Sequence, residues 1–164
     1  MIPTISINEI LETFVASLAA DTALNDYCQA QFSKDVSIFW GYNGQTPPAA
    51  SNCPYIVIYP DQKVEGVDEN IYKYTIPVDW AVTNETQTTS GKVVTLVGIG
   101  QCDAMGQLIL ACLNEVSVDH PIVTANYRIA ATKTEAATLY PQIAGQMKLT
   151  INVARSIGAT VSYP

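Results

Sequence analysis

The sequence predicts an α+β fold in which two principal helices pack on one face of a mainly antiparallel sheet. Apolar residues recur at helical spacing near the N-terminus and in the middle of the chain, whereas other segments alternate apolar and polar residues as strands do. We expect one domain over residues 1–164, because a chain of 164 residues buries about two-thirds of its unfolded surface in a single core. The expected order is a helix with a second helical segment, three strands, a helix and two strands.

The first fifth of the chain is predicted to be helical. Ser6-Ile7-Asn8-Glu9 has the pattern of a capping box, and apolar residues follow it every three or four positions as far as Leu18. This spacing predicts an amphipathic helix over about residues 6–20. Asp21 can cap a second helical segment that continues to Phe32.

Two strands and an acidic loop are expected next. From Val36 the apolar period changes to two, which predicts a strand that ends before the polar segment at Asn43. Pro54 precedes a run over 55–59 that is apolar on both faces, as in a central strand covered on both sides. Residues 61–70 are rich in acidic residues and glycine, and we expect them to form a solvated loop.

A long third strand and the second principal helix follow. The longest alternation covers residues 71–82, and because Pro77 has no backbone N–H we expect this strand to lie at a sheet edge or to be bulged. Residues 84–91 are expected to form a polar loop. Residues 93–97 fit either a strand or a first helical turn, and the spacing over about 100–115 predicts a helix.

Two strands complete the predicted fold. The segment Tyr127–Ala131 is predicted to be a strand, Thr134–Gly145 a loop, and the strict alternation from Met147 to Val153 the last strand. Residues 158–164 are expected to form a flexible C-terminal tail.

The charge of the chain excludes tight binding to nucleic acid or to an anionic membrane. Fifteen acidic and eight basic residues give a net charge of −7, and the basic residues form no cluster that could displace counterions from phosphates. No apolar run is long enough to span a membrane, and the N-terminus lacks a signal-peptide pattern. We therefore expect synthesis in the cytoplasm, where the four cysteines remain reduced and serve as small buried apolar residues.

The search for catalytic, cofactor-binding and metal-binding residues gives no candidate. His120 is the single histidine, and in Val118-Asp119-His120-Pro121 it is expected to occupy a solvated loop, without a G-x-S-x-G nucleophile motif elsewhere. Gly98-Ile99-Gly100 precedes a helix, but the third glycine of a dinucleotide motif would fall at Asp103, so flexibility or close packing is favoured. Gly106, inside that helix, indicates close approach of a neighbouring segment.

Clusters of acidic and aromatic residues suggest contacts with partners. The acidic residues of the 61–70 segment do not have the spacing of a calcium loop, and loops of this composition commonly contact other proteins. Tyrosine and tryptophan are enriched in interface anchors. Each aromatic residue on the predicted strands therefore belongs either to the core or to a subunit boundary, and the residues concerned are Trp40, Tyr55, Tyr72, Tyr74 and Trp80.

The order of these elements resembles that of the tail terminator proteins of long-tailed phages, also called tail completion or minor tail proteins. The resemblance is carried by the capped helix Ile7–Leu18, the strand Pro54–Ile58, the strand through Tyr74–Trp80, the helix Ala104–Leu113 and the strand Lys148–Val153. It covers nearly the whole chain and rests on pattern and order. The long loop Asn43–Cys53 and the C-terminal extension depart from it.

The resemblance implies a structural, non-catalytic protein of the virion tail that is assembled in the host cytoplasm. In similar proteins a hexameric ring caps the tail tube, ends its polymerisation and offers the surface to which the filled head joins. The implied partners are further copies of the chain, the tail tube protein and the head–tail connector proteins. DNA is expected to pass through the acidic ring without tight binding.

We expect the subunit or tail-tube contacts to lie along the exposed edge of the long strand and in the loops at its ends. The residues concerned are Asp61, Lys63, Glu65, Asp68, Glu69, Tyr74, Trp80, Asn84 and Glu85. A head-closure or neck component of a phage is the nearest alternative function. A small ligand-binding or enzymatic α+β domain with a pocket under the sheet is the alternative from another class.

Overall fold

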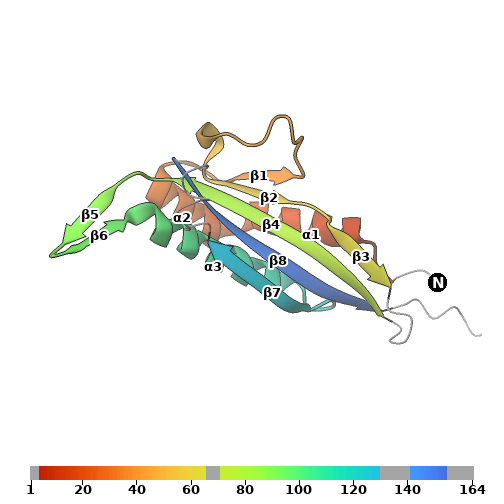
Figure 1. The fold of residues 1–164 in the computed structure, drawn as a ribbon. Coiled ribbons are helices and arrows are strands. Elements are labelled where there is room, and N and C mark those ends of the chain that lie inside the picture. The colour runs from red at the N-terminus through yellow and green to blue at the C-terminus, as the bar shows by residue number, and fades with distance from the viewer. Residues whose placement is uncertain (1–3, 66–70, 130–140, 155–164) are drawn as a thin grey trace, which may run out of the picture.

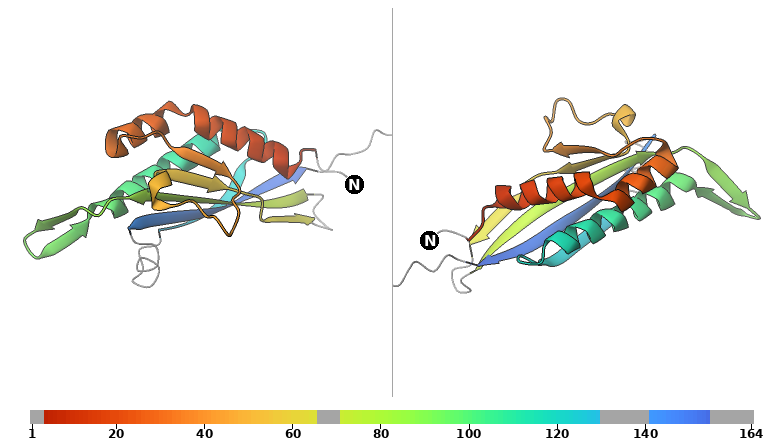
Figure 2. Two further views of the ribbon diagram at one scale, coloured as in Figure 1. Left: turned by 90° about the horizontal axis from the view of Figure 1, so that it is seen from above. Right: turned by 180° about the vertical axis from the view of Figure 1, so that it is seen from behind.

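The computed structural model describes residues 4–65, 71–129 and 141–154. These residues form three α-helices, one 3₁₀ turn and eight strands, most of them in a mainly antiparallel sheet. The fold is therefore α+β, as the sequence predicts. The helices lie side by side on one face of the sheet (Figure 1, Figure 2).

The helices begin where the sequence places their caps. Helix α1 (Ile7–Ala20) has the full capping box, in which the Ser6 side chain accepts from the Glu9 N–H and the Glu9 carboxylate accepts from the Ser6 N–H. Helix α2 (Thr22–Phe32) begins after Asp21, whose carboxylate accepts from the Leu24 N–H at 2.7 Å. Helix α3 (Val97–Val116) is longer at both ends than the helix predicted over 100–115.

The main sheet has the strand order β1-β2-β4-β8-β7, and β3 pairs with the remaining part of β4. The strands are β1 (Ser37–Trp40), β2 (Tyr55–Ile58), β3 (Gln62–Glu65), β4 (Ile71–Thr83), β7 (Ile122–Ile129) and β8 (Gln142–Ala154). Strands β1 and β2 are parallel, and the other pairs are antiparallel. The turn η1 (Ala50–Asn52) lies in the long loop between β1 and β2.

Strands β4 and β8 are the two longest strands, and they pair in the middle of the main sheet. Their register is continuous from Ile71 opposite Ala154 to Thr83 opposite Gln142. Alternate side chains of both strands point to the helices and are buried, as the period of two predicts. The core consists of these side chains and the apolar stripes of the three helices, among them Phe14, Leu18, Leu24, Ile76, Val78, Met105, Ile109, Met147, Leu149 and Ile151.

Pro77 lies inside the sheet, so the expectation of an edge strand is wrong and the alternative of a bulge applies. Strand β4 pairs with β8 on one side and with β2 and β3 on the other. Ile58 lies opposite Val78, but Gln62 lies opposite Thr75, so the partner side carries one extra residue between β2 and β3. The Pro77 carbonyl still accepts a backbone N–H from that side at 3.4 Å, and the hydrogen bond that proline cannot donate falls at this irregularity.

Three loop predictions also need correction. Within the segment expected to be an acidic loop over 61–70, residues 62–65 form β3, because their backbone pairs with β4. The polar segment 84–91 contains β5 (Gln87–Ser90), and the ambiguous segment 93–97 contains β6 (Val93–Leu96) followed by the first residue of α3. The loop predicted over Thr134–Gly145 is wrong at its end, because β8 begins at Gln142 and not at Met147. The strand predicted over 127–131 begins earlier, at Ile122. The predicted tail over 158–164 lies outside the described residues.

Strands β5 and β6 form a two-stranded hairpin that is separate from the main sheet and projects from the body of the molecule (Figure 1). Gly91 and Lys92 are the two residues of its turn, and Gly91 has φ +60°. Glycine with positive φ at the first position is characteristic of a type II′ turn, whose twist matches that of the strands. We call the residues Gln87–Leu96 the arm.

Candidate functional site

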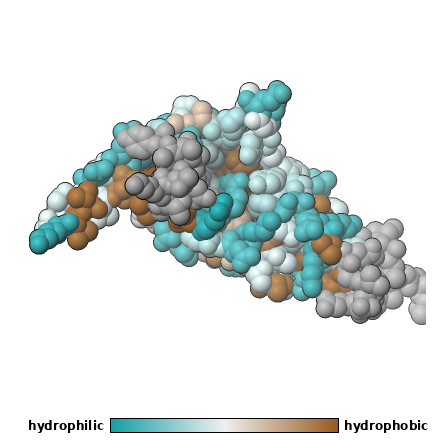
Figure 3. All heavy atoms as spheres, in the orientation of Figure 1, coloured by the Kyte–Doolittle hydropathy of each residue, from teal (hydrophilic) through white to brown (hydrophobic). Residues whose placement is uncertain are grey.

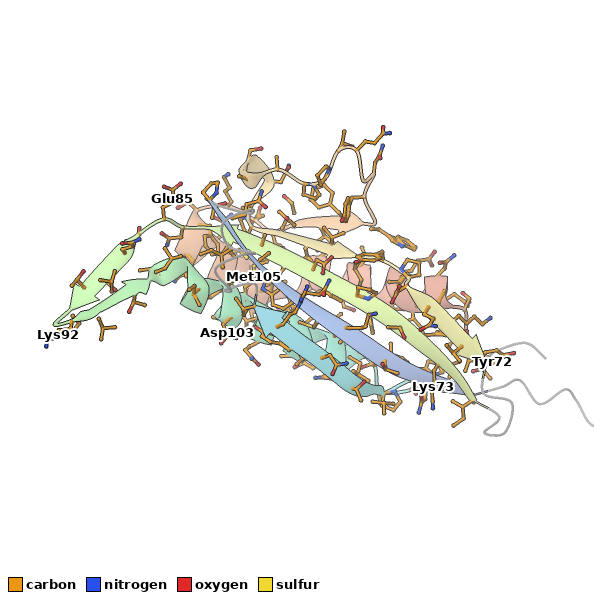
Figure 4. All side chains as sticks on the ribbon, in the orientation of Figure 1. Tyr72, Lys73, Glu85, Lys92, Asp103 and Met105 are labelled. Atoms are coloured by element: carbon orange, nitrogen blue, oxygen red, sulfur yellow. The ribbon has the colours of Figure 1, made fainter. Side chains whose placement is uncertain are left out.

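The nine residues expected at an interface do not form one surface. Asp61, Lys63 and Glu65 lie along the β3 side of β4, whereas Asn84 and Glu85 follow the other end of β4, roughly 30 Å away at the usual rise of a strand. Figure 4 shows this separation, with Glu85 near the arm and Tyr72 and Lys73 at the far end. Asp68 and Glu69 lie outside the described residues.

The charged residues at the β3 end make contacts within the chain. Asp61 forms an ion pair with Lys148 of β8, with a distance of 2.8 Å between Nζ and Oδ2. The Lys63 ammonium lies 4.8 Å from the centre of the Tyr72 ring, which is a cation–π distance. The Asp61–Lys148 pair reaches across β4, and the Lys63–Tyr72 pair joins the neighbouring strands β3 and β4. Asp61 and Lys63 remain exposed to a partner as well.

Asn84 positions the base of the arm. Its side-chain oxygen accepts from the Thr86 N–H at 2.9 Å, and its side-chain nitrogen donates to the Gln101 side chain at 2.7 Å. The Val97 N–H donates to the Thr86 carbonyl at 2.9 Å. The two ends of the hairpin are therefore fixed to each other and to the first turns of α3.

Tyr74 and Trp80 are fully buried in the core of the monomer, so the expectation that they lie at a subunit boundary is wrong for these two. The Tyr74 hydroxyl donates to the Ile5 carbonyl at 2.9 Å and holds the segment before α1 against the sheet. Trp80 donates from Nε1 to the Cys102 carbonyl of α3 at 2.8 Å. Of the aromatic residues left open between core and boundary, Trp40 is instead 47% exposed.

Two glycines make room for the Trp80 indole. A Cβ atom at Gly106 of α3 or at Gly145 of β8 would overlap the Trp80 ring. The Tyr127 ring packs against the indole with its centre 5.2 Å away. The prediction that Gly106 indicates close approach of a neighbour is confirmed, and that neighbour is Trp80.

The sheet face opposite the helices carries a half-buried polar cluster. Asp79 accepts from the Gln146 amide at 2.7 Å and from the Tyr59 hydroxyl at 3.3 Å. Burial raises the pKa of the Asp79 carboxyl, while these two hydrogen bonds lower it in part. Burial and the neighbouring Asp79 raise the pKa of Tyr59 to about 12. The cluster joins β2, β4 and β8 on this face.

His120 lies in the connection between α3 and β7, beside α1. It lines a small hollow of about 160 Å³ together with Ile5, Phe14 and Val116, whereas drug-sized ligands occupy roughly 300–1,000 Å³. The neighbouring Ser117 hydroxyl donates its one proton within the end of α3, to the Leu113 carbonyl at 2.7 Å. His120 therefore has no activated serine beside it in the described connection.

The start of α3 is tightly packed. A Cβ at Gly98 would meet the Ile143 side chain and would lie 2.8 Å from the Asn84 carbonyl oxygen, whereas Gly100 faces open space. Close packing at Gly98, one of the two explanations that the sequence leaves open, is therefore confirmed.

The cysteines are free and buried, which confirms the expectation drawn from their spacing. Burial raises the pKa of Cys28 to about 11 and that of Cys102 and Cys112 to about 12, so these thiols stay protonated at neutral pH. In the described ranges, the histidine, cysteine and acidic side chains form no group that could hold a metal ion. None of the described helices has the length and hydropathy that crossing a membrane requires.

The arm is the most exposed apolar feature near the N-terminus of α3. Val93 and Val94 are 62% and 60% exposed, and Lys92 lies at the tip (Figure 4). Figure 3 shows hydrophobic residues on the arm behind a hydrophilic tip. A two-stranded hairpin is only marginally stable alone in water, so an arm of this kind gains stability when a partner covers it. The sequence reasoning missed the arm, although a glycine turn between two Thr- and Val-rich runs signals a hairpin.

The sequence matches no protein-family model and no curated protein.

Proposed function

We propose that this chain is a structural protein that assembles with copies of itself into a ring on the tail tube of a long-tailed phage. In this role the ring ends polymerisation of the tube and provides the surface to which the head joins. The resemblance in element order to tail terminator proteins supports this proposal. The function needs binding surfaces and no catalytic group.

The observation that carries the proposal is the projecting arm. It extends away from the core (Figure 1), exposes two adjacent valines and pairs with no strand of the main sheet in the described ranges. An arm with this geometry can reach a neighbouring subunit without disturbing the body that bears it. Head-to-tail contacts between identical subunits generate closed rings when the rotation between neighbours closes.

The charge of the chain fits a ring that admits DNA without holding it. A net charge of −7 per subunit surrounds the channel with negative potential, which repels phosphates and keeps association with the duplex weak at physiological salt. The partners of such a ring are the tail tube protein on one side and the head–tail connector proteins on the other.

The proposal is tested by native mass spectrometry and negative-stain microscopy of the purified chain, alone and mixed with tail tubes from the same phage. We expect a sixfold ring in solution or at the end of the tube. A ring that binds connector proteins but never tubes would favour the head-closure or neck function. A monomer under both conditions that binds a small molecule in a pocket would favour the ligand-binding alternative.

A further inference from the structure

Two groups of exposed apolar residues lie at opposite ends of α3. One group belongs to the arm, which leads directly into the N-terminus of α3. The other group lies at the C-terminus of α3, where Val118 is 79% exposed and Val116 is 36% exposed beside the hollow that His120 lines. We call Glu115, Val116, Val118, Asp119 and this hollow the end patch.

The end patch is large enough for the side chains of the arm. The hollow has a volume of about 160 Å³, and its floor includes Ile5, Ile10 and Phe14 of the α1 region. Valine side chains are small, and the two adjacent valines of the arm point to opposite faces of β6 because strand residues alternate. The valine on the face that meets the patch can enter the hollow.

The charges of the two surfaces are complementary. The arm carries Lys92 at its tip, and the end patch carries the exposed carboxylates Glu115 and Asp119. The last turn of α3 contains no basic residue, so the negative end of the helix dipole adds to these carboxylates. Lys92 of another subunit would therefore meet a negative site, although the subunits carry the same net charge.

We infer that the arm of one subunit docks on the end patch of the next copy of this chain, with one of the two valines, Val93 or Val94, entering the hollow and Lys92 facing Glu115 and Asp119. The contact is heterologous because the arm and the patch lie at different ends of one helix. Each subunit then both donates an arm and receives one. The inference rests on the proposed function, for which it names the subunit contact.

The decisive variants remove one surface at a time. Val93→Asp with Val94→Asp places two carboxylates on the arm, and Val118→Asp places one on the patch. All three valines are exposed, so the thermal unfolding temperature of the monomer should not change. Association measured by sedimentation velocity should weaken about 10-fold for the arm variant, since it loses the burial of one valine side chain.

Mixing the variants tests the head-to-tail geometry. The arm variant retains an intact patch and the V118D variant retains an intact arm, so a mixture should form dimers that cannot extend. A contact between two arms would instead leave V118D association unchanged. That result, or a ring that survives V93D with V94D, overturns the inference while the proposed function stands.

A disulfide crosslink tests directly whether the arm and the end patch of two subunits are in contact. Chains with Lys92→Cys and chains with Asp119→Cys are mixed and oxidised, alone and on tail tubes, while the native thiols remain buried. We expect a disulfide-linked dimer. The control pairs Lys92→Cys with Asp26→Cys, an exposed position on α2, and should give no such dimer. Equal yields from both pairs overturn the inference.

Charge reversal supplies a milder test. Lys92→Glu and Asp119→Lys should each weaken association about two- to five-fold, the range of an exposed ion pair, and a chain with both changes should recover. Failure of the double variant to recover argues against this pairing. A wild-type chain that never associates, alone or on tail tubes, overturns the proposed function together with the inference.

Discussion

Trp80 connects three elements of the fold. It belongs to β4, donates a hydrogen bond to the backbone of α3, and occupies the space left by Gly106 of α3 and Gly145 of β8. The tight packing of the sheet against α3 therefore depends on one indole ring. This explains why a glycine in the middle of a helix, where it is otherwise unfavourable, occurs in α3.

Trp80→Ala should lower the free energy of unfolding by about 3–5 kcal/mol, because it leaves a cavity in the core and removes the hydrogen bond to the Cys102 carbonyl. Thermal or urea unfolding measures the loss. Trp40→Ala is the matched control, since Trp40 is 47% exposed and its removal should change stability by less than about 1 kcal/mol. A folded W80A monomer with wild-type stability would contradict the burial of Trp80.

Asp79→Asn should keep or slightly raise stability at neutral pH. The folded state raises the pKa of this carboxyl, so it holds the proton more tightly than the unfolded state does. The free energy of unfolding therefore falls as the pH rises from the ordinary carboxyl pKa through the raised one. An asparagine can keep both hydrogen bonds, to Gln146 and Tyr59.

The measurement for Asp79 is the thermal unfolding temperature from pH 4 to pH 7 in both proteins. The wild type should lose stability relative to D79N as the pH rises across this range. Asp26→Asn, at an exposed position, controls for the loss of one negative charge. A D79N protein that is less stable than wild type at pH 7 would show that the ionised carboxylate stabilises the fold.

At the scale of single residues, the sequence predicts local hydrogen bonds such as helix caps better than it predicts which side chains are buried. The caps at Ser6 and Asp21 follow from local hydrogen bonding, which a sequence displays directly. Whether an aromatic residue on a strand is buried depends on which face the helices cover, and alternation alone does not say. For this reason the expectation that Tyr74 and Trp80 lie at a boundary is wrong: both are in the core, where Trp80 contacts α3 and Tyr74 contacts the segment before α1.

The secondary-structure elements also differ in how well the sequence predicts them. Helices and long strands have strong periodicity, so α1, α2 and β4 are predicted with nearly correct bounds, whereas β8 begins five residues before the predicted Met147. The four-residue strands β3 and β5 are polar, and they form because their backbones pair with β4 and β6. Strands this short and polar show no apolar period, so their sequences favour loops.

Shortening the arm should leave the body folded. Gln87 lies opposite Leu96, so replacing residues 88–95 with Asn-Gly closes a two-residue turn at that pair. The unfolding temperature should change by no more than a few degrees, since the removed residues are exposed. Unfolding of the shortened chain would mean that the arm stabilises the body of its own subunit.

At the scale of the whole molecule, one face of the sheet makes the core, and the arm and the end patch lie at opposite ends of α3. Contacts between subunits through these two surfaces therefore extend along the direction of α3. The sequence could not predict this arrangement, because the arm and the end patch are brought to opposite ends by α3, whose length becomes clear only with its true bounds.

The assembled protein should not bind duplex DNA tightly. With a net charge of −7 per chain, it should give no shift of a DNA fragment in an electrophoretic assay at about 150 mM salt, where exposed charges act over about 8 Å. A DNA-binding protein of similar size serves as the positive control. A stable complex at that salt concentration would contradict a channel that DNA traverses freely.

The continuous ladder between β4 and β8 also has a consequence for how the chain acquires its fold. A ribosome delivers residues 71–83 well before residues 142–154, so the central strand waits for its partner while its apolar side chains are uncovered. Contacts this distant in sequence slow folding and expose the intermediate to aggregation. A nascent chain that is halted before β8 should therefore depend on chaperones to stay in solution.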